Sequence, residues 1–404
     1  MQKTHLGRTV GLLAILWGGC VLSIAFCKDF AQLAAVRFLQ GAFECAITPA
    51  FLLITSSFYP TRELPLRVFI WGIGSTSFGV ISDISLYGIG RAATKSQAIA
   101  PWKGISFFLG GLTILVGIVC FFLLGTAREV PWLSEEEKRI AYARTVQNHT
   151  GTDREKHAKF DWAQAREYLT DPQIYFIFFA QLVNSAPNSG INTFGNLVYT
   201  SFGFTPLDTF LKGTVPRNAF AFSLFLCLGV LMLKRPNTCF IIMIVCIIPA
   251  IVSFSLLAFL PNSLDLLWPK WGFFFMSAPS LVSGPLLQTV SATNVAGRTK
   301  RTVTLTVLFV GYFAGSAAGA QIFQADDAPR YIRAIAIVSC LYVLELTIMI
   351  SWRTYYALEN RRRNKVQAAA GISEDKRLRL GGLNAELGMT DRCKSSFCFS
   401  YSID

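Results

Sequence analysis

Ten long apolar runs alternate with polar segments along most of the chain. A bilayer core about 30 Å thick is crossed by roughly 20 residues of helix, so each run is long enough to span it. The runs lie at 9–27, 30–58, 67–90, 103–125, 173–199, 209–233, 238–260, 267–293, 302–325 and 331–354. This pattern predicts an all-α integral membrane protein with about ten transmembrane helices.

One polar segment, residues 126–172, is much longer than the other connections and divides the runs into four and six. We therefore expect four parts. These are a half-bundle over 1–125, a cytosolic central loop over 126–172, a second half-bundle over 173–354 and a cytosolic basic tail over 355–404. The polar and basic sequence from Glu359 onward predicts disorder in the tail.

Two helices are predicted within the central loop. Ser134 is followed three residues later by Glu137, which is the spacing of a capping box. A helix is therefore expected to begin there and to continue through Val146. A second short helix is expected at about 161–169, before the Asp-Pro pair that precedes the fifth apolar run.

The composition changes the picture by excluding soluble classes of protein. Of the 404 residues, 52% are hydrophobic and only 15% are charged, and the mean hydropathy is +0.45. Soluble domains carry about 25% charged residues, so a cytosolic enzyme and a disordered regulator are excluded. The net charge is +13, and the basic residues that produce it lie mostly between the apolar runs and in the tail. We therefore expect the lipid bilayer as a partner and no nucleic acid.

The distribution of Lys and Arg predicts the orientation in the membrane. When the N-terminus is placed in the cytosol, the segments on the cytosolic side hold most of the basic residues, including those of 126–172 and of the tail. Basic residues favour the cytosolic side, so both termini are expected there. The Asn148-His149-Thr150 sequon in the central loop is then expected to remain unglycosylated.

Ionisable residues inside the apolar runs are candidates for function, because charge in a bilayer is costly. Arg37 and Glu44 are seven residues apart and share a helix face. Arg37 could attract an anionic substrate while Glu44 carries a proton, or the two could form a structural pair with neighbouring helices. For Glu345 a structural role is favoured over one in transport. Lys212 and Arg217 could line a pathway, or they could lie near the end of their span and extend toward the membrane surface, which is the favoured interpretation.

The fifth run combines helix-weakening residues with amides. Asn184, Asn188 and Asn192 recur every four residues, with Pro187 and Gly190 between them. Weakened helices with polar faces in mid-membrane are where transporters place substrates. The alternative is hydrogen bonding between packed helices, which is common in membrane bundles.

Three further patterns concern packing and metals. Gly311, Gly315 and Gly319 recur every four residues, which predicts close approach of another helix. Most of the ten cysteines lie within or at the ends of apolar runs, and no Cys-x-x-Cys spacing occurs. No cofactor and no metal site are therefore expected.

Four stretches together resemble a known family. They are 37–44, which reads Arg-Phe-Leu-Gln-Gly-Ala-Phe-Glu, the amide-rich segment 184–195, the Asn-Val-Ala-Gly sequence at 294–297, and the Ala-Pro-Arg-Tyr sequence at 328–331. In combination they resemble the major facilitator superfamily, in its fungal anion:cation symporter branch, the allantoate permease group. The resemblance covers roughly residues 3–365.

The resemblance implies a helical bundle that carries small organic anions such as allantoate, nicotinate or pantothenate, usually with protons, by alternating access in the plasma membrane. It implies that Arg37 binds the substrate's charge and that Glu44 couples protons. The substrate-binding amides would be Asn184, Asn188, Asn192 and Asn294.

The resemblance also marks a departure. Family members have twelve spans, and residues 2–8 match the loop that follows their second span, so the first two helices are expected to be missing. This observation keeps a second hypothesis open, a non-transporting remnant or a membrane-bound sensor of the same fold. A membrane-embedded enzyme is not favoured, because the sequence contains no His-Glu-x-x-His or Gly-x-Ser-x-Gly motif.

Overall fold

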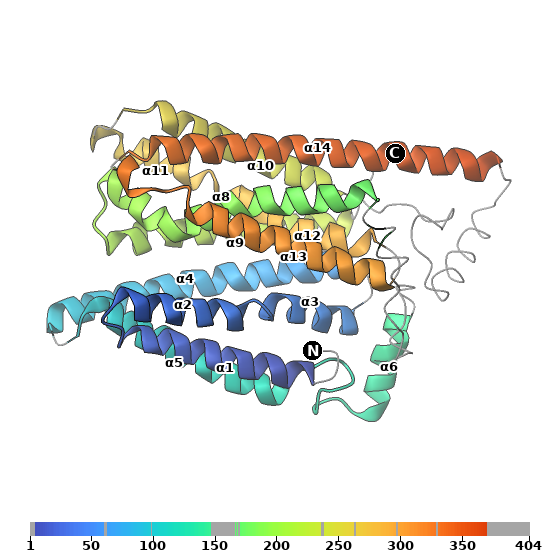
Figure 1. Cartoon of the computed structure of the whole chain (residues 1–404), viewed down its shortest axis with the longest axis horizontal. Helices are drawn as coiled ribbons and strands as arrows, with labels where there is room; N and C mark the ends of the chain where they lie inside the picture. Colours follow the sequence, from blue (N-terminus) through green and yellow to red (C-terminus); the bar gives the residue numbers. More distant parts are fainter. Residues whose placement is uncertain are drawn as a thin grey trace. The chain divides into compact units, whose positions relative to one another are not determined.

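The computed structural model of the chain is helical (Figure 1). It describes residues 5–59, 63–97, 99–146, 166, 168, 170–235, 238–261, 264–295, 298–328 and 330–369. Within these residues nine helical segments are long and apolar enough to cross a membrane, and no strand is present. The all-α integral membrane fold predicted from the sequence is confirmed.

The fifth predicted span differs from the nine apolar segments. It forms helix α8, Pro172–Phe202, whose 31 residues are long enough to cross a bilayer. Its amide side chains, Asn184 among them, make it less apolar than the other spans. Together with the nine apolar segments, α8 accounts for the ten expected spans.

The chain divides into two compact units, which we call the first unit and the second unit. The first unit contains residues 1–64 and 82–148, and the second contains residues 65–81 and 149–404. Helix α4, Leu64–Ser96, therefore contributes to both. The division of the chain into four functional parts stays a prediction.

The first unit contains α1, α2, α3, α5 and α6 besides the second part of α4. Their bounds are Leu6–Ile24, Phe30–Glu44, Ile47–Phe58, Pro101–Leu123 and Glu135–Val146. Helix α1 packs on α5 through glycines on both helices. A Cβ on Gly11 would lie 2.5 Å from the backbone of Phe121, and a Cβ on Gly117 would lie 2.8 Å from the Ile15 nitrogen. The two backbones therefore approach closely because side chains are absent.

The second unit is built around α8 and α14, Ile332–Ala369. Its other segments are the π-helix Thr209–Thr214, α9 Val215–Lys234, α10 Cys239–Phe259, α11 Leu267–Phe275, the 3₁₀ segment η4 Ala278–Val282, α12 Ser283–Thr293 and α13 Arg298–Ala320. Large buried aromatic rings from several helices, such as Phe240, Phe274 and Trp352, form one continuous apolar core.

The glycine repeat of α13 lies directly against α8, as predicted. A Cβ on Gly315 would collide with the Leu182 carbonyl oxygen, and a Cβ on Gly319 would collide with the Ala186 carbonyl oxygen. The Ser189 hydroxyl also donates to the Ser316 carbonyl oxygen at 3.0 Å. This contact holds α8, which carries the amides, against α13.

Helix α6 begins with the predicted capping box. The Ser134 backbone N–H donates to Glu137 Oε2 at 2.9 Å, and the Glu137 N–H donates to Ser134 Oγ at 3.3 Å. The hydrogen bonds from the Ser134 N–H and hydroxyl lower the pKa of Glu137 below its usual range. The helix beginning predicted from the sequence is confirmed.

We expect Ser134→Ala to loosen the first turn of α6, because the Glu137 N–H loses its acceptor. Hydrogen exchange of the peptide covering 134–146, followed by mass spectrometry, should be roughly fivefold faster in the variant. The lowered Glu137 pKa means that the cap is intact at neutral pH and is lost as the pH falls through that value. Ser134→Asp keeps an acceptor and serves as the control. Equal exchange rates in Ser134→Ala and the native protein would contradict the role of the cap.

The tail differs from the prediction over its first part. Helix α14 does not end near residue 354 but continues to Ala369. Glu359 lies 3.6 Å from Arg362 Nη1 and accepts from Arg363 Nε at 3.0 Å, so charges three and four residues apart stabilise the helix. The tail beyond Ala369, most of the second loop helix and the Asn148 sequon lie outside the described residues.

Candidate functional site

A buried carboxyl group on α14 is the centre of a polar region inside the second unit. Glu345 is completely buried, and its Oε1 accepts a hydrogen bond from Asn184 Nδ2 at 2.8 Å. Its Oε2 is buried and has no hydrogen-bond partner among the described residues. Buried polar groups are normally satisfied, so an oxygen without a donor marks a place where a ligand or a water can bind.

The three amides of α8 share a face but differ in exposure. Asn184 is buried, Asn188 is half-buried and Asn192 is exposed. Asn188 Nδ2 donates to the Asn184 carbonyl oxygen at 2.9 Å, and Asn188 Oδ1 is buried without a partner. Helix α8 is continuous through Pro187 rather than broken there. The predicted polar face therefore exists on an intact helix.

Two further segments contribute to this region. The hydroxyls of Ser280, on η4, and Tyr342, on α14, are 3.1 Å apart and both residues are buried. A Cβ on Gly284, at the start of α12, would lie 3.2 Å from Asn184 Oδ1. Helices α8, α12 and α14 and the segment η4 thus bring amide, hydroxyl and carboxyl groups together inside the second unit.

Arg217 provides a positive charge in the same unit. Its side chain is only 7% exposed, and neither its Nε nor its Nη2 has a hydrogen-bond partner among the described residues. Helix α9, which carries Arg217, packs against η4, the segment that carries Ser280. The sequence interpretation that Arg217 extends to the membrane surface is wrong, because its helix packs the side chain inward.

The Arg37 and Glu44 side chains, on α2 of the first unit, are both exposed. Arg37 Nη1 donates to Gln40 Oε1 at 3.3 Å, one turn along the same helix. Neither Arg37 nor Glu44 forms an ion pair with a described residue. Among the described residues, Arg37 and Glu44 therefore form no ion pair that would join α2 to a neighbouring helix.

Asn294 lies at the C-terminal end of α12 and is completely buried. Both of its amide atoms lack hydrogen-bond partners among the described residues. It follows Gly284, the neighbour of Asn184, by ten residues, which correspond to about 15 Å of helix. The structure therefore places Asn294 away from the other amides, toward the end of the second unit at which α8 begins.

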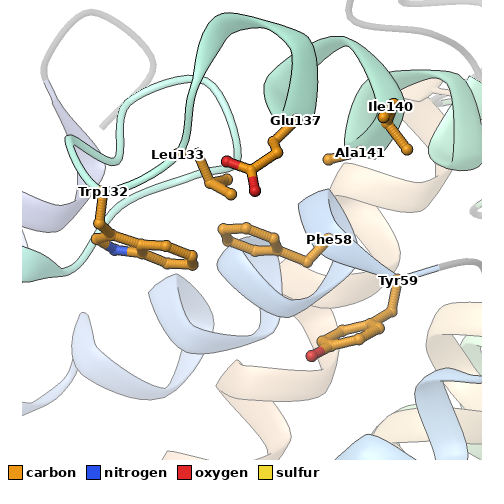
Figure 2. A pocket seen from close by; sticks show the side chains of 7 residues that line it. All are labelled: Phe58, Tyr59, Trp132, Leu133, Glu137, Ile140 and Ala141. Carbon is orange, nitrogen blue, oxygen red and sulfur yellow. The ribbon is translucent and has the colours of Figure 1, made fainter.

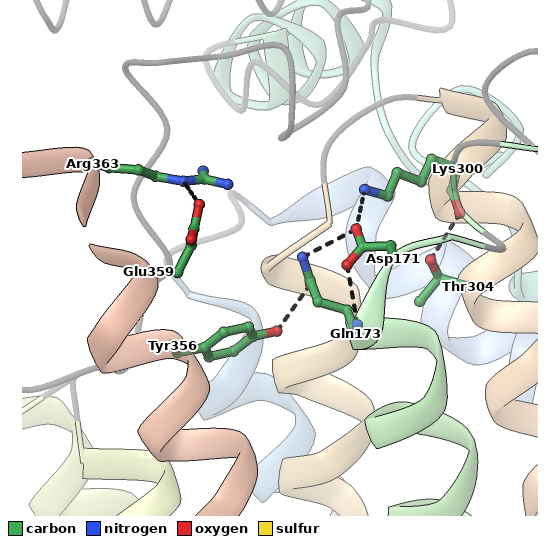
Figure 3. A network of polar contacts seen from close by, with 7 residues as sticks. All are labelled: Asp171, Gln173, Lys300, Thr304, Tyr356, Glu359 and Arg363. Atoms are coloured by element: carbon green, nitrogen blue, oxygen red, sulfur yellow. Dashed lines mark hydrogen bonds and ion pairs between the residues drawn. The ribbon is translucent and has the colours of Figure 1, made fainter. Parts of the chain in front are cut away.

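A buried ion pair joins two helices at that end of the unit (Figure 3). Lys300 Nζ, on α13, lies 2.6 Å from Asp171 Oδ2, and both side chains are almost completely buried. Asp171 Oδ1 also accepts from the Gln173 N–H at 3.1 Å and so caps α8. Gln173 Oε1 accepts from the Tyr356 hydroxyl at 3.1 Å. The network connects α8, α13 and α14.

A pocket of about 260 Å³ lies in the first unit between the end of α3 and α6 (Figure 2). Its lining is mostly apolar, and the Phe58 and Trp132 rings stack with their centroids 6.2 Å apart. The one carboxylate of its lining, Glu137, belongs to the cap of α6. The pocket offers no positive charge, so it does not suit an anion.

Comparison with known proteins decides the family. Residues 5–320 match the Major Facilitator Superfamily. The chain belongs to this superfamily. It is 30% identical over 406 residues to an uncharacterized transporter of Schizosaccharomyces pombe, a match that covers 99% of this chain and 74% of the relative. The resemblance inferred from the sequence is confirmed.

Two named transporters and one solved structure are also similar to the chain. The allantoate permease of Saccharomyces cerevisiae is 27% identical over 93% of this chain and 69% of its own length. A thiamine pathway transporter of the same yeast is 27% identical over 91% of this chain and 69% of its own length. The same fold is found in a bacterial homolog of the human lysosomal transporter Spinster, whose structure was solved in an inward-facing, unoccupied conformation. The TM-score is 0.51 at 15% sequence identity, and the match covers 86% of this chain and 81% of that chain.

As a member of the Major Facilitator Superfamily, the chain is a multi-pass membrane transporter. Sequence reasoning missed part of its polar interior. Glu345 and Arg217 are visible in the sequence as ionisable residues within apolar runs, but the sequence does not show that both are buried. Ser280 and Tyr342 carry no sequence signal, because a single hydroxyl is ordinary in a membrane span.

Proposed function

We propose that this transporter carries a small organic anion, a carboxylate such as allantoate, nicotinate or pantothenate, in symport with protons and by alternating access. The buried amide and carboxyl groups around Asn184, inside a chain related to the allantoate permease, carry the proposal. The protein would act in the plasma membrane with both termini in the cytosol, an orientation supported by its basic residues.

Each site residue has a role in this proposal. Arg37 binds the substrate's negative charge, because its guanidinium can present two parallel N–H donors to a carboxylate. Asn188 and Asn192, with Asn184, orient the substrate through their amides. The free Oδ1 of Asn188 supports this role, because a buried acceptor without a donor is available to a ligand.

The proposal also gives roles to Asn294 and Glu44. Asn294, which lies away from the other amides, would contact the substrate at a separate point of its path, and the two unpartnered atoms of its buried amide support a role in binding. Glu44 would carry the proton, because it is the acidic group on the same helix as Arg37. Intramembrane acidic residues commonly form proton relays in transporters.

We expect Arg37→Ala to lower the uptake of labelled substrate about tenfold or more, because the anion loses its counter-charge. Labelled allantoate, nicotinate and pantothenate are supplied separately to cells or proteoliposomes that contain the full chain, with and without an inward proton gradient. Glu44→Gln should leave uptake that no longer responds to the gradient.

Arg91→Ala is the matched control, because Arg91 is an exposed arginine on a helix of the same unit. Its uptake should equal that of the native protein. Uptake that survives Arg37→Ala would overturn the role of Arg37. Binding of a substrate without uptake in proteoliposomes would instead favour a membrane-bound sensor.

A further inference from the structure

Arg217 is a buried cation with no carboxylate paired to it among the described residues. Its guanidinium is 7% exposed, and no described carboxylate lies within 4.0 Å of it. Its Nε and Nη2 donate to no described atom. An ion inside a protein is costly unless it is paired and hydrogen-bonded. A guanidinium in this state therefore provides free donors for an anion that is not part of the chain.

The buried acid Glu345 makes its hydrogen bond with another residue. Glu345 lies about one helical turn from Tyr342 on α14, and Arg217 lies on α9, which packs against the η4 segment that carries Ser280. Glu345 nevertheless accepts its hydrogen bond from Asn184 and makes no ion pair with Arg217. The Ser280 and Tyr342 hydroxyls, 3.1 Å apart, thus belong to elements next to a buried acid and a buried arginine that form no ion pair with each other.

The backbone before Arg217 has an unusual conformation. Residues Thr209–Thr214 form a π-helix, a rare geometry that is frequent at functional sites. The Tyr199 hydroxyl donates to the Gly213 carbonyl oxygen at 3.2 Å and holds this turn. The neighbouring cation Lys212 is half-exposed and pairs with Asp208 at 3.3 Å. The paired, half-exposed cation thus lies within the π-helical turn, and the unpaired, buried cation lies in the first turn of α9, which follows it.

We propose that Arg217 is an anion-binding residue of the second unit and binds the carboxylate of the substrate, with the Tyr342 and Ser280 hydroxyls as the adjacent hydrogen-bonding groups. This inference rests on the proposed function in one respect, namely that the transported substrate is an organic anion. A guanidinium favours planar oxyanions, because its fork can donate two parallel hydrogen bonds to them.

The first measurement is the midpoint of thermal unfolding of the whole chain in detergent, without added ligand. Arg217→Met should raise the midpoint of unfolding by about 2 °C or more, because it removes an unpaired buried charge and keeps the volume. Lys212→Met, five residues away and exposed, should leave the midpoint unchanged or lower it slightly. A lower midpoint for Arg217→Met would overturn the proposal, because it would show that the charge stabilises the fold.

The second measurement adds allantoate, nicotinate and pantothenate at millimolar concentration, with neutral nicotinamide as a control compound. We expect at least one anion to stabilise the native protein and the Lys212→Met variant, and none to stabilise Arg217→Met. Arg217→Lys should retain a weaker shift, because an ammonium lacks the fork.

The outcomes separate this inference from the proposed function. A shift that Arg217→Met retains would overturn the role of Arg217 alone. A shift that Arg217→Met loses, together with uptake that survives Arg37→Ala, would support Arg217 and overturn the role of Arg37. No shift and no uptake with any of the three anions would overturn the substrate class and this inference together.

Discussion

Gly315→Val is expected to prevent the chain from folding. The valine Cβ would collide with the Leu182 carbonyl oxygen of α8, and a backbone atom inside a helix cannot move aside as a flexible side chain can. Overpacking of a well-packed interior typically costs 1–3 kcal/mol, and a backbone collision at the main contact between α8 and α13 is expected to cost at least about 3 kcal/mol. The measurement is the yield of monodisperse protein after detergent extraction, which should fall to a small fraction of that of the native chain.

The matched control is Gly111→Val on α5. A Cβ at Gly111 meets no atom within 4 Å, although Gly111 also lies in the middle of an apolar helix. The control should therefore be extracted as well as the native chain. If Gly315→Val were also extracted in normal yield with an unchanged unfolding midpoint, the close approach of α8 and α13 would be incorrect.

Lys300→Met is expected to destabilise the protein by about 3–5 kcal/mol, because it leaves the buried Asp171 carboxylate without its counter-charge. The two hydrogen bonds from Gln173 remain, but neither supplies a positive charge. Thermal unfolding in detergent should show a midpoint many degrees below that of the native protein.

The double variant Asp171→Asn/Lys300→Met separates charge from packing. Asparagine removes the negative charge and keeps an oxygen that can accept the Gln173 N–H at the beginning of α8. Most of the lost stability should therefore return, because replacing both members of a buried pair is often nearly neutral. A double variant as unstable as Lys300→Met would show that the Lys300 side chain stabilises the unit by packing rather than by its charge.

Much of the fold could be predicted from local sequence. The weak run at 209–233 illustrates both the success and the limit. It was expected as a span and forms the π-helix followed by α9, but nothing in its residues predicts the π-helical geometry. The tail shows the same limit, because α14 continues past residue 354 through Glu359, whose pairing with Arg363 favours a helix where polarity alone predicted disorder.

The candidate site could be predicted only in part. Asn184, Asn188 and Asn192 were identifiable from their spacing, because a period of four places them on one helix face. Their different exposures depend on which helices pack against α8. Asn294 is also an asparagine, but it lies at the far end of α12 from the neighbour of Asn184. The burial of Arg217 could not be predicted, because a sequence does not show which side of α9 faces the interior.

The sequence by itself determined the membrane spans, the helix beginning at Ser134 and the family, because hydropathy, capping and motifs depend on residues that are near one another in the chain. The tertiary structure decided which polar groups meet. Asn184 and Glu345 are 161 residues apart and form one hydrogen bond, and Asp171 and Lys300 are 129 residues apart and form one ion pair. Such contacts depend on how whole helices pack, and glycines such as Gly315 allow that packing by leaving room for the backbone of α8.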